Sequence, residues 1–186
     1  MSGLEPTTTG GKIPAIMIIH QEGVIALIAV VALSFRTPGL LTGLAPKHSF
    51  AEAVLVGVGI GLACFMVLWL IRGIGPLADL ENWQRRMVQG WTKTDAAAVA
   101  VFSGLAEEAF IRAFLQPLVG LLPAAAVFAV LHIVPERRLW LWPVVALGMG
   151  LVLGWGFSYG GYPTAAVAHV VINGLSLVRL RAEATE

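Results

Sequence analysis

The stretch GLAEEAFIRAF, residues 104–114, places two carboxylates and a guanidinium inside an otherwise apolar segment. AAAVAVFSGLA leads into it and FLQPLVGLLPAAAVFAVL continues from it, and outside the stretch neither flank holds a charged residue. A charged side chain at the centre of a membrane helix costs about 2.5–3.5 kcal/mol on insertion scales. Glu107, Glu108 and Arg112 therefore need pairing, hydration or protonation, and the fold has to supply it.

The composition of the whole chain indicates that its solvent is lipid. Of 186 residues, 58% are hydrophobic and 12% are charged, whereas soluble domains carry about 25% charged residues. We expect a disordered tail over residues 1–12, a single integral membrane domain over 13–181 and a short stub over 182–186. The net charge of +1 and the lack of a basic stripe predict no nucleic-acid partner. The single cysteine, Cys64, is interpreted as a small core residue, since one cysteine builds neither a disulfide framework nor a metal site.

Hydrophobic runs of about 20 residues are long enough to span a membrane. Six such segments are present, at 13–35, 50–71, 95–116, 117–134, 140–159 and 163–180. The first contains a polar cluster, His20, Gln21 and Glu22, that a plain span does not explain. Between the second and third, apolar residues near helical spacing predict an interfacial amphipathic helix, with a solvated connector as the alternative. The predicted fold is all-α, a polytopic helix bundle of about six transmembrane helices plus one interfacial helix.

Basic residues are distributed unequally between the two sides of this predicted bundle. If the N-terminus is cytoplasmic, nine fall on the inner side, namely Lys12, Arg72, Arg85, Arg86, Lys93, Arg137, Arg138, Arg179 and Arg181. Only Arg36 and Lys47 fall on the outer side. Because cytoplasmic loops carry an excess of basic residues, we expect both termini in the cytoplasm, in a multi-pass protein of a prokaryotic plasma membrane.

Helical spacing separates the roles of the two glutamates. Glu108 and Arg112 are four residues apart and share a helix face, which favours an ion pair. Glu107 is rotated about 100° from Glu108. One glutamate therefore has a partner and the other is spare.

Two histidines lie in other apolar segments. His132 ends the run VFAVLHIV, and His169 is followed one turn later by Asn173. A single membrane histidine is commonly a hydrogen-bond partner for a neighbouring helix. Together with the glutamates, however, these residues supply a base, two imidazoles and an amide, which can activate water and stabilise an oxyanion. The residues indicate an intramembrane polar site, with hydrolysis as one interpretation.

Two other classes of function use the same residues. Buried Glu and His side chains also form proton relays, so a small transporter is an alternative, although no inverted repeat is visible between the halves of the chain. A non-catalytic membrane scaffold is the third interpretation. A cleavage assay and an ion-flux assay separate the first two.

Three short motifs resemble those of one family of membrane proteases. EEAFIR fits EExxxR, FAVLH fits FxxxH and HVVIN fits HxxxN, in this order and on separate segments between about residues 95 and 180. The set resembles the CPBP (Abi) family of intramembrane glutamate-type proteases, which includes CAAX-prenyl endopeptidases and bacteriocin-processing proteins. The resemblance implies an endopeptidase that acts on a membrane-embedded or lipid-anchored peptide within the bilayer. The oligomeric state and the side of substrate entry are not indicated.

The resemblance also implies roles for individual residues. Glu107 would be the general base that takes a proton from water, and His132 would help to hold that water. His169 and Asn173 would stabilise the oxyanion of the tetrahedral intermediate. Glu108, Arg112 and Phe128 would shape the site.

Metal chemistry is the alternative to a glutamate mechanism. Glu107, His132 and His169 could hold zinc with an open fourth position. The helical HExxH signature is absent, and an amide at Asn173 suits an oxyanion better than zinc. We therefore expect no metal cofactor.

Depth counting gives inconsistent positions for these residues. Glu107 lies about 18 Å from the cytoplasmic start of its predicted helix, at 1.5 Å per residue. His132 is three residues before Pro135 on the inner side, and His169 is six residues after Pro163 on the outer side. A tilt, a bend or a shifted helix boundary is needed to bring them together.

Overall fold

The computed structural model describes residues 12–184, and within this range every regular element is a helix. The predicted all-α fold is confirmed. The predicted tail lies outside the described residues except for Lys12, and so do the last two residues of the predicted stub. In chain order the elements are α1 (Ala15–Ser34), α2 (Leu40–Gly43), α3 (Phe50–Ile71), α4 (Pro76–Met87), α5 (Lys93–Glu108), the π-helix η1 (Ala109–Leu115), α6 (Gln116–Val119), α7 (Leu121–Leu131), the 3-10 turn η2 (Arg137–Leu139), α8 (Leu141–Gly160) and α9 (Tyr162–Glu183).

Four helical segments are long and apolar enough to cross a membrane. They are Ala15–Ser34, Phe50–Ile71, Arg137–Gly160 and Tyr162–Glu183, each close to the length of about 20 residues that a bilayer requires. Together with the composition, they make the chain a membrane protein. The predicted number of six spans is not confirmed, because the third and fourth predicted spans differ from simple membrane helices.

The third predicted span is interrupted and the fourth is short. α5 gives way to the π-helix η1 and then to the single turn α6. Gly120 follows with a φ of 87°, a left-handed conformation that glycine adopts without strain and that ends the helix. α7 then has only 11 residues and stops at Leu131, with His132 at its C-cap. The predicted boundaries of this helix, 117–134, are therefore too wide at both ends.

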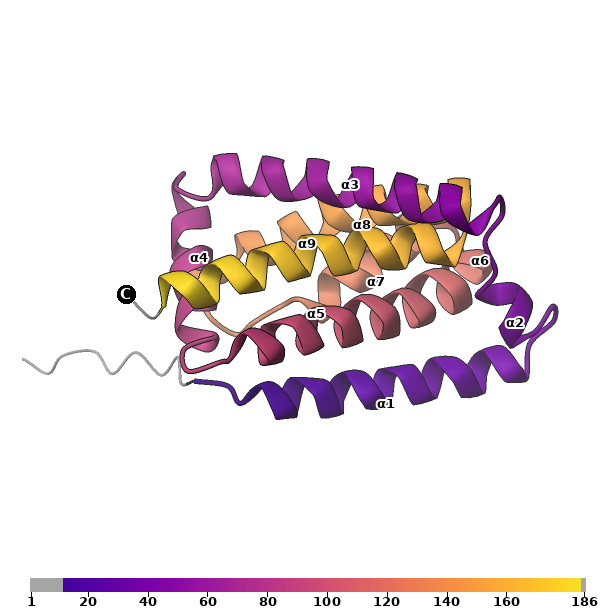
Figure 1. Cartoon of the computed structure of the whole chain (residues 1–186), viewed down its shortest axis with the longest axis horizontal. Helices are drawn as coiled ribbons and strands as arrows, with labels where there is room; N and C mark the ends of the chain where they lie inside the picture. The colour runs from indigo at the N-terminus through magenta and orange to yellow at the C-terminus, as the bar shows by residue number, and fades with distance from the viewer. Residues whose placement is uncertain (1–11, 185–186) are drawn as a thin grey trace, which may run out of the picture.

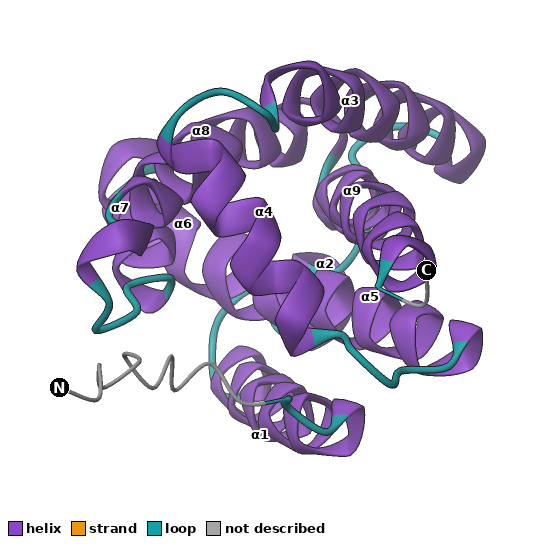
Figure 2. Ribbon diagram, turned by 90° about the vertical axis from the view of Figure 1, so that its left-hand side faces the viewer, coloured by secondary structure: helices purple, strands orange, loops and turns teal. Residues whose placement is uncertain are grey.

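The long helices lie side by side, with α9 at the centre. Figure 1 shows α1, α5, α9 and α3 running along the long axis, and α9 packs against both α3 and α5. α7 and α8 pair with each other, and α8 also contacts α9. The predicted amphipathic helix is present as α4, which lies across one end of the bundle (Figure 2). α9 thus carries its polar residues into the middle of the molecule.

Glycines let α9 approach its neighbours closely. A Cβ atom at Gly61 of α3 would lie 2.6 Å from the Cβ of Val171, and one at Gly104 of α5 would lie 2.6 Å from Cγ2 of Val170. Helices in lipid associate through such close packing, because burial of apolar surface gives no driving force there. The two glycines therefore fix α9 between α3 and α5, beside the pair of glutamates.

Ion pairs gather at the end of the bundle that α4 covers. At the end covered by α4, Arg179 of α9 bonds Glu81 at 2.6 and 2.9 Å, and Arg85 bonds Glu183 at 2.7 Å. α9 continues to Glu183, beyond the predicted end of its span at residue 180. These ion pairs tie α4 to the end of α9 and close that end of the bundle.

Candidate active site

Two of the three charged residues in the opening stretch are fully enclosed. Glu108 and Arg112 both have 0% exposed surface. Oε2 of Glu108 accepts a hydrogen bond from Nε of Arg112 at 3.0 Å, and Oε1 lies 2.9 Å from Nδ1 of His169. The ion pair predicted from the four-residue spacing is present. A contact that the spacing could not reveal joins the same carboxylate to α9.

The π-helix η1 carries the arginine of this pair. Nη1 of Arg112 donates to Oε1 of Gln116 at 3.5 Å, and Nε2 of Gln116 donates to the carbonyl of Gly154 at 2.9 Å. The guanidinium also lies over the ring of Phe128, 5.3 Å from its centroid. π-helical turns are rare and occur frequently at functional sites. Through these two hydrogen bonds Gln116, which the sequence analysis did not select, links the charged pair to α8.

Both histidines use Nδ1 to bind a fixed acceptor. Nδ1 of His132 lies 2.8 Å from the carbonyl oxygen of Phe128, and Nδ1 of His169 faces the carboxylate of Glu108. A carbonyl or carboxylate oxygen only accepts, so in both rings Nδ1 carries a proton and Nε2 is left for other partners. The Phe128 ring lies between the histidines, with centroid distances of 4.5 Å to His132 and 5.9 Å to His169.

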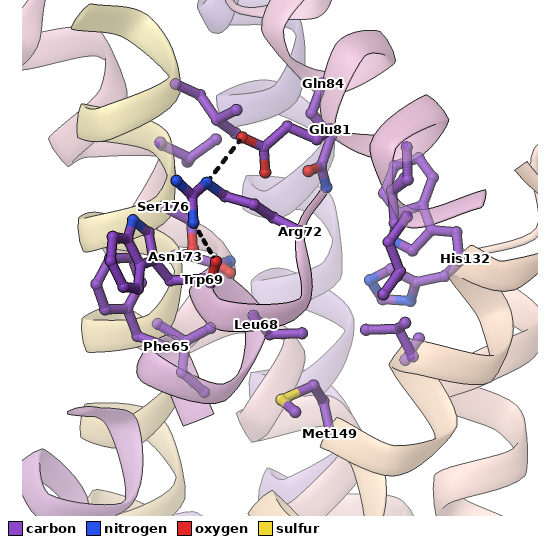
Figure 3. A pocket seen from close by; sticks show the side chains of 18 of the residues that line it. Phe65, Leu68, Trp69, Arg72, Glu81, Gln84, His132, Met149, Asn173 and Ser176 are labelled. Carbon is purple, nitrogen blue, oxygen red and sulfur yellow. Dashed lines mark hydrogen bonds and ion pairs between the residues drawn. The ribbon is translucent and has the colours of Figure 1, made fainter. Parts of the chain in front are cut away.

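One partly open cavity brings together most of the predicted site residues. Its volume is about 170 Å³, and Phe128, His132, His169 and Asn173 line it. In Figure 3, His132 faces across the cavity toward residues of α3, and Asn173 lies behind them on α9. For the two histidines the depth inconsistency disappears, because α7 is short and ends at His132, which reaches the same cavity as His169. Two histidines and an amide therefore share one cavity.

The walls of the cavity change character along its length. Arg72, Glu81 and Gln84 provide the polar end near α4, whereas Phe65 and Met149 belong to an apolar part (Figure 3). Arg72 pairs with Glu81 at 3.9 Å and also bonds the carbonyl of Trp69. The cavity thus offers a polar surface near α4 and an apolar surface farther from it.

Asn173 is held by a residue that the sequence analysis did not select. Its Nδ2 donates to Oγ of Ser103 on α5 at 2.9 Å, and Ser103 itself is buried and donates to the carbonyl of Ala100 at 3.3 Å. This contact fixes the amide against α5. A serine in an apolar helix gives little signal, because many such serines bond only their own backbone.

Glu107 lies apart from the cavity. It is half-buried and is absent from the residues that line the cavity, as is Glu108. The carboxyl group of Glu107 lies within hydrogen-bonding reach of Glu22 on α1, and its charge acts on His169. The structure therefore places Glu107 on the α1 side of His169, with the cavity on the other side.

The residues proposed for zinc do not form a metal-binding group here. Among residues 12–184, no three His, Cys, Asp or Glu side chains are arranged to share a metal ion. Nδ1 of each histidine is already engaged, and Glu107 faces α1. As arranged, the donor set does not fit zinc, and the expectation of no metal cofactor stays a prediction.

Comparison with known proteins finds a family match for the segment that contains all three motifs. Residues 89–175 match a family model described as type II CAAX prenyl endopeptidase Rce1-like. No curated protein and no solved structure matches the chain. The matched segment runs from just before α5 to Asn173 and beyond, and α1 and α3 lie outside it. The resemblance inferred from the motifs is confirmed.

Proposed function

We propose that the chain hydrolyses a peptide bond of a membrane-embedded or lipid-anchored substrate, with a water activated by Glu107. The match of residues 89–175 to the Rce1-like endopeptidases supports this, because it implies a CAAX-type intramembrane endopeptidase. The observation that carries the proposal is the convergence of His132, His169 and Asn173 on one pocket. Glu107 lies close enough to His169 for their charges to interact.

In the proposed reaction, the water oxygen attacks the scissile carbonyl carbon and the water proton passes to the carboxylate of Glu107. The C–N bond then breaks as Glu107 returns this proton to the leaving nitrogen. Nε2 of neutral His132 accepts a hydrogen bond from the water, which orients it for attack. Because Glu107 does not line the cavity, water has to enter beside the ring of His169.

The developing oxyanion needs hydrogen-bond donors that are already in place. Asn173 supplies an amide, and His169 supplies Nε2–H when its ring is doubly protonated. The Glu108 carboxylate 2.9 Å from Nδ1 stabilises such an imidazolium, as a carboxylate does behind the histidine of a catalytic triad. Arg112 in turn holds Glu108 ionised and in place. Glu108 and Arg112 are thus positioning residues, which agrees with the role that the resemblance implies.

The experiment compares variants in proteoliposomes with an internally quenched, farnesylated peptide that ends in a CAAX sequence. Glu107→Gln is expected to abolish cleavage and leave the protein folded, because it removes only the base. Asp79→Asn, an exposed acid on α4, is the matched control and should cleave at the wild-type rate. Wild-type activity in Glu107→Gln would refute the mechanism.

Substrate identity is tested separately, by comparing peptides in membrane fractions that contain the wild-type chain or Glu107→Gln. Peptides whose ends appear only with the wild-type chain identify the substrate. Proton flux that depends on Glu107, without any cleavage, would instead establish the transporter alternative.

A further inference from the structure

Glu22 is a buried acid of α1 that forms no ion pair with any residue between 12 and 184. It is 3% exposed, whereas its neighbours His20 and Gln21 point outward. Its Oε2 atom is enclosed and has no hydrogen-bond partner among the described residues. An ionised carboxylate in this position is costly within a membrane helix. The polar cluster noted in the sequence thus contains one residue that the fold turns inward and that the proposed function does not use.

The groups that face Glu22 are those of the candidate active site. α1 packs against α5, η1 and α2. α2, with the sequence LLTG, has no titratable side chain. α5 contributes Glu107 and Glu108, η1 contributes Arg112, and the charge of His169 on α9 also reaches Glu22. Arg112 directs Nε to Glu108 and Nη1 to Gln116. Of these charged groups, the carboxyl group of Glu107 is the one within hydrogen-bonding reach of Glu22.

Two adjacent carboxyl groups, one of them buried, repel each other when both are ionised, because burial reduces the screening of their charges by water. One proton between them removes the repulsion and creates a hydrogen bond. The carboxyl groups of Glu22 and Glu107 lie within hydrogen-bonding reach of each other, which such a shared proton requires.

We propose that Glu22 is a positioning residue for Glu107: its protonated carboxyl group donates a hydrogen bond to the Glu107 carboxylate and holds this base beside His169. The inference rests on the proposed function and assigns a residue outside the segment that matches the family. During turnover Glu22 keeps its own proton, and Glu107 alone gains and returns the proton of the water. α1 is therefore part of the catalytic machinery as well as a packing partner of α5.

Two substitutions separate this role from a purely structural one. Glu22→Gln keeps the shape and a hydrogen-bond donor, since the amide can donate to Glu107. Glu22→Leu keeps a similar volume and removes the donor. If Glu22 only fills space, leucine is the better replacement, because it also removes a buried polar group that lacks a partner.

The expected result separates the two roles by activity. Glu22→Leu should still fold, with kcat lowered about 10- to 100-fold and KM unchanged, as expected for loss of one hydrogen bond to a charged group. Glu22→Gln should keep kcat within about threefold of wild type. Wild-type kcat in Glu22→Leu, or equally slow Glu22→Gln and Glu22→Leu, would overturn the proposal.

Infrared spectroscopy tests the hydrogen bond without any substrate. The wild-type protein in neutral buffer should show the carbonyl stretch of a protonated carboxyl group, and Glu22→Gln should lose this band. Glu107→Gln should retain it, because Glu22 then stays protonated alone. A spectrum without the band in the wild type would contradict the inference.

The two proposals fail in different ways. Active Glu22→Leu beside inactive Glu107→Gln overturns the role of Glu22 and leaves the proposed function intact. Active Glu107→Gln overturns the proposed function and, with it, the role of Glu22 in catalysis.

Discussion

The buried pair of Glu108 and Arg112 allows a quantitative test of the site. Arg112→Met keeps most of the side-chain volume but removes the charge, and it leaves the carboxylate of Glu108 enclosed with only His169 as a partner. Both members of the pair are 0% exposed. Breaking a buried ion pair from one side costs about 3–5 kcal/mol, because the remaining charge has lost both water and its partner. We therefore expect Arg112→Met to lower the free energy of unfolding by about this amount.

The double variant Glu108→Gln/Arg112→Met should be more stable than Arg112→Met alone. No buried charge remains in it, and Oε1 of the glutamine still accepts the proton on Nδ1 of His169. A residual loss of about 1–3 kcal/mol is expected from imperfect hydrogen bonding. Unfolding of the four proteins by SDS in mixed micelles, followed by circular dichroism, closes the double-mutant cycle. Additive losses, or an Arg112→Met protein within about 1 kcal/mol of wild type, would refute the assignment of a strongly coupled buried pair.

Three further predictions concern packing, chemistry and orientation. Gly61→Ala should destabilise the protein by about 1–3 kcal/mol, because its Cβ would lie 2.6 Å from a valine of α9. Gly59→Ala is the control: a Cβ there would have nothing within 4 Å, so this variant should be neutral or slightly stabilising in the same SDS titration. EDTA or phenanthroline should leave cleavage intact if Glu107 is the base; loss of activity that added zinc restores would show metal chemistry instead. In inside-out vesicles, a membrane-impermeant maleimide should label a cysteine at the exposed position Thr94 and not one at Thr37 if both termini are cytoplasmic.

Local spacing was sufficient to predict the contacts that lie within one helix. The Glu108–Arg112 pair follows from four-residue periodicity, and so does the shared face of His169 and Asn173. Contacts between helices could not be predicted in this way, because they depend on how α1, α5 and α9 pack. Glu22 carried a usable signal, an acid inside an apolar span.

The length of α7 was mispredicted for a related reason. Hydrophobicity continues without a break from α6 through α7, so it gave no sign that the chain turns at Gly120. Gly120 was the available signal, since glycine is the usual residue where a helix ends with positive φ. The π-helix η1 had no such signal, because its sequence AFIRAFL is also a good α-helix.

The charges of the buried polar residues explain why a third glutamate is compatible with a membrane interior. When His169 carries its second proton to stabilise an oxyanion, His169 and Arg112 are positive, and Glu107 and Glu108 are negative before the water is deprotonated. This set is neutral only if Glu22 is protonated. An ionised Glu22 would leave a net negative charge among helices that face lipid, at a cost of a few kcal/mol. The pairing also gives the two adjacent glutamates different roles. Glu108 is bound to a cation and stays a carboxylate, whereas Glu107 is next to a neutral acid and can accept a proton.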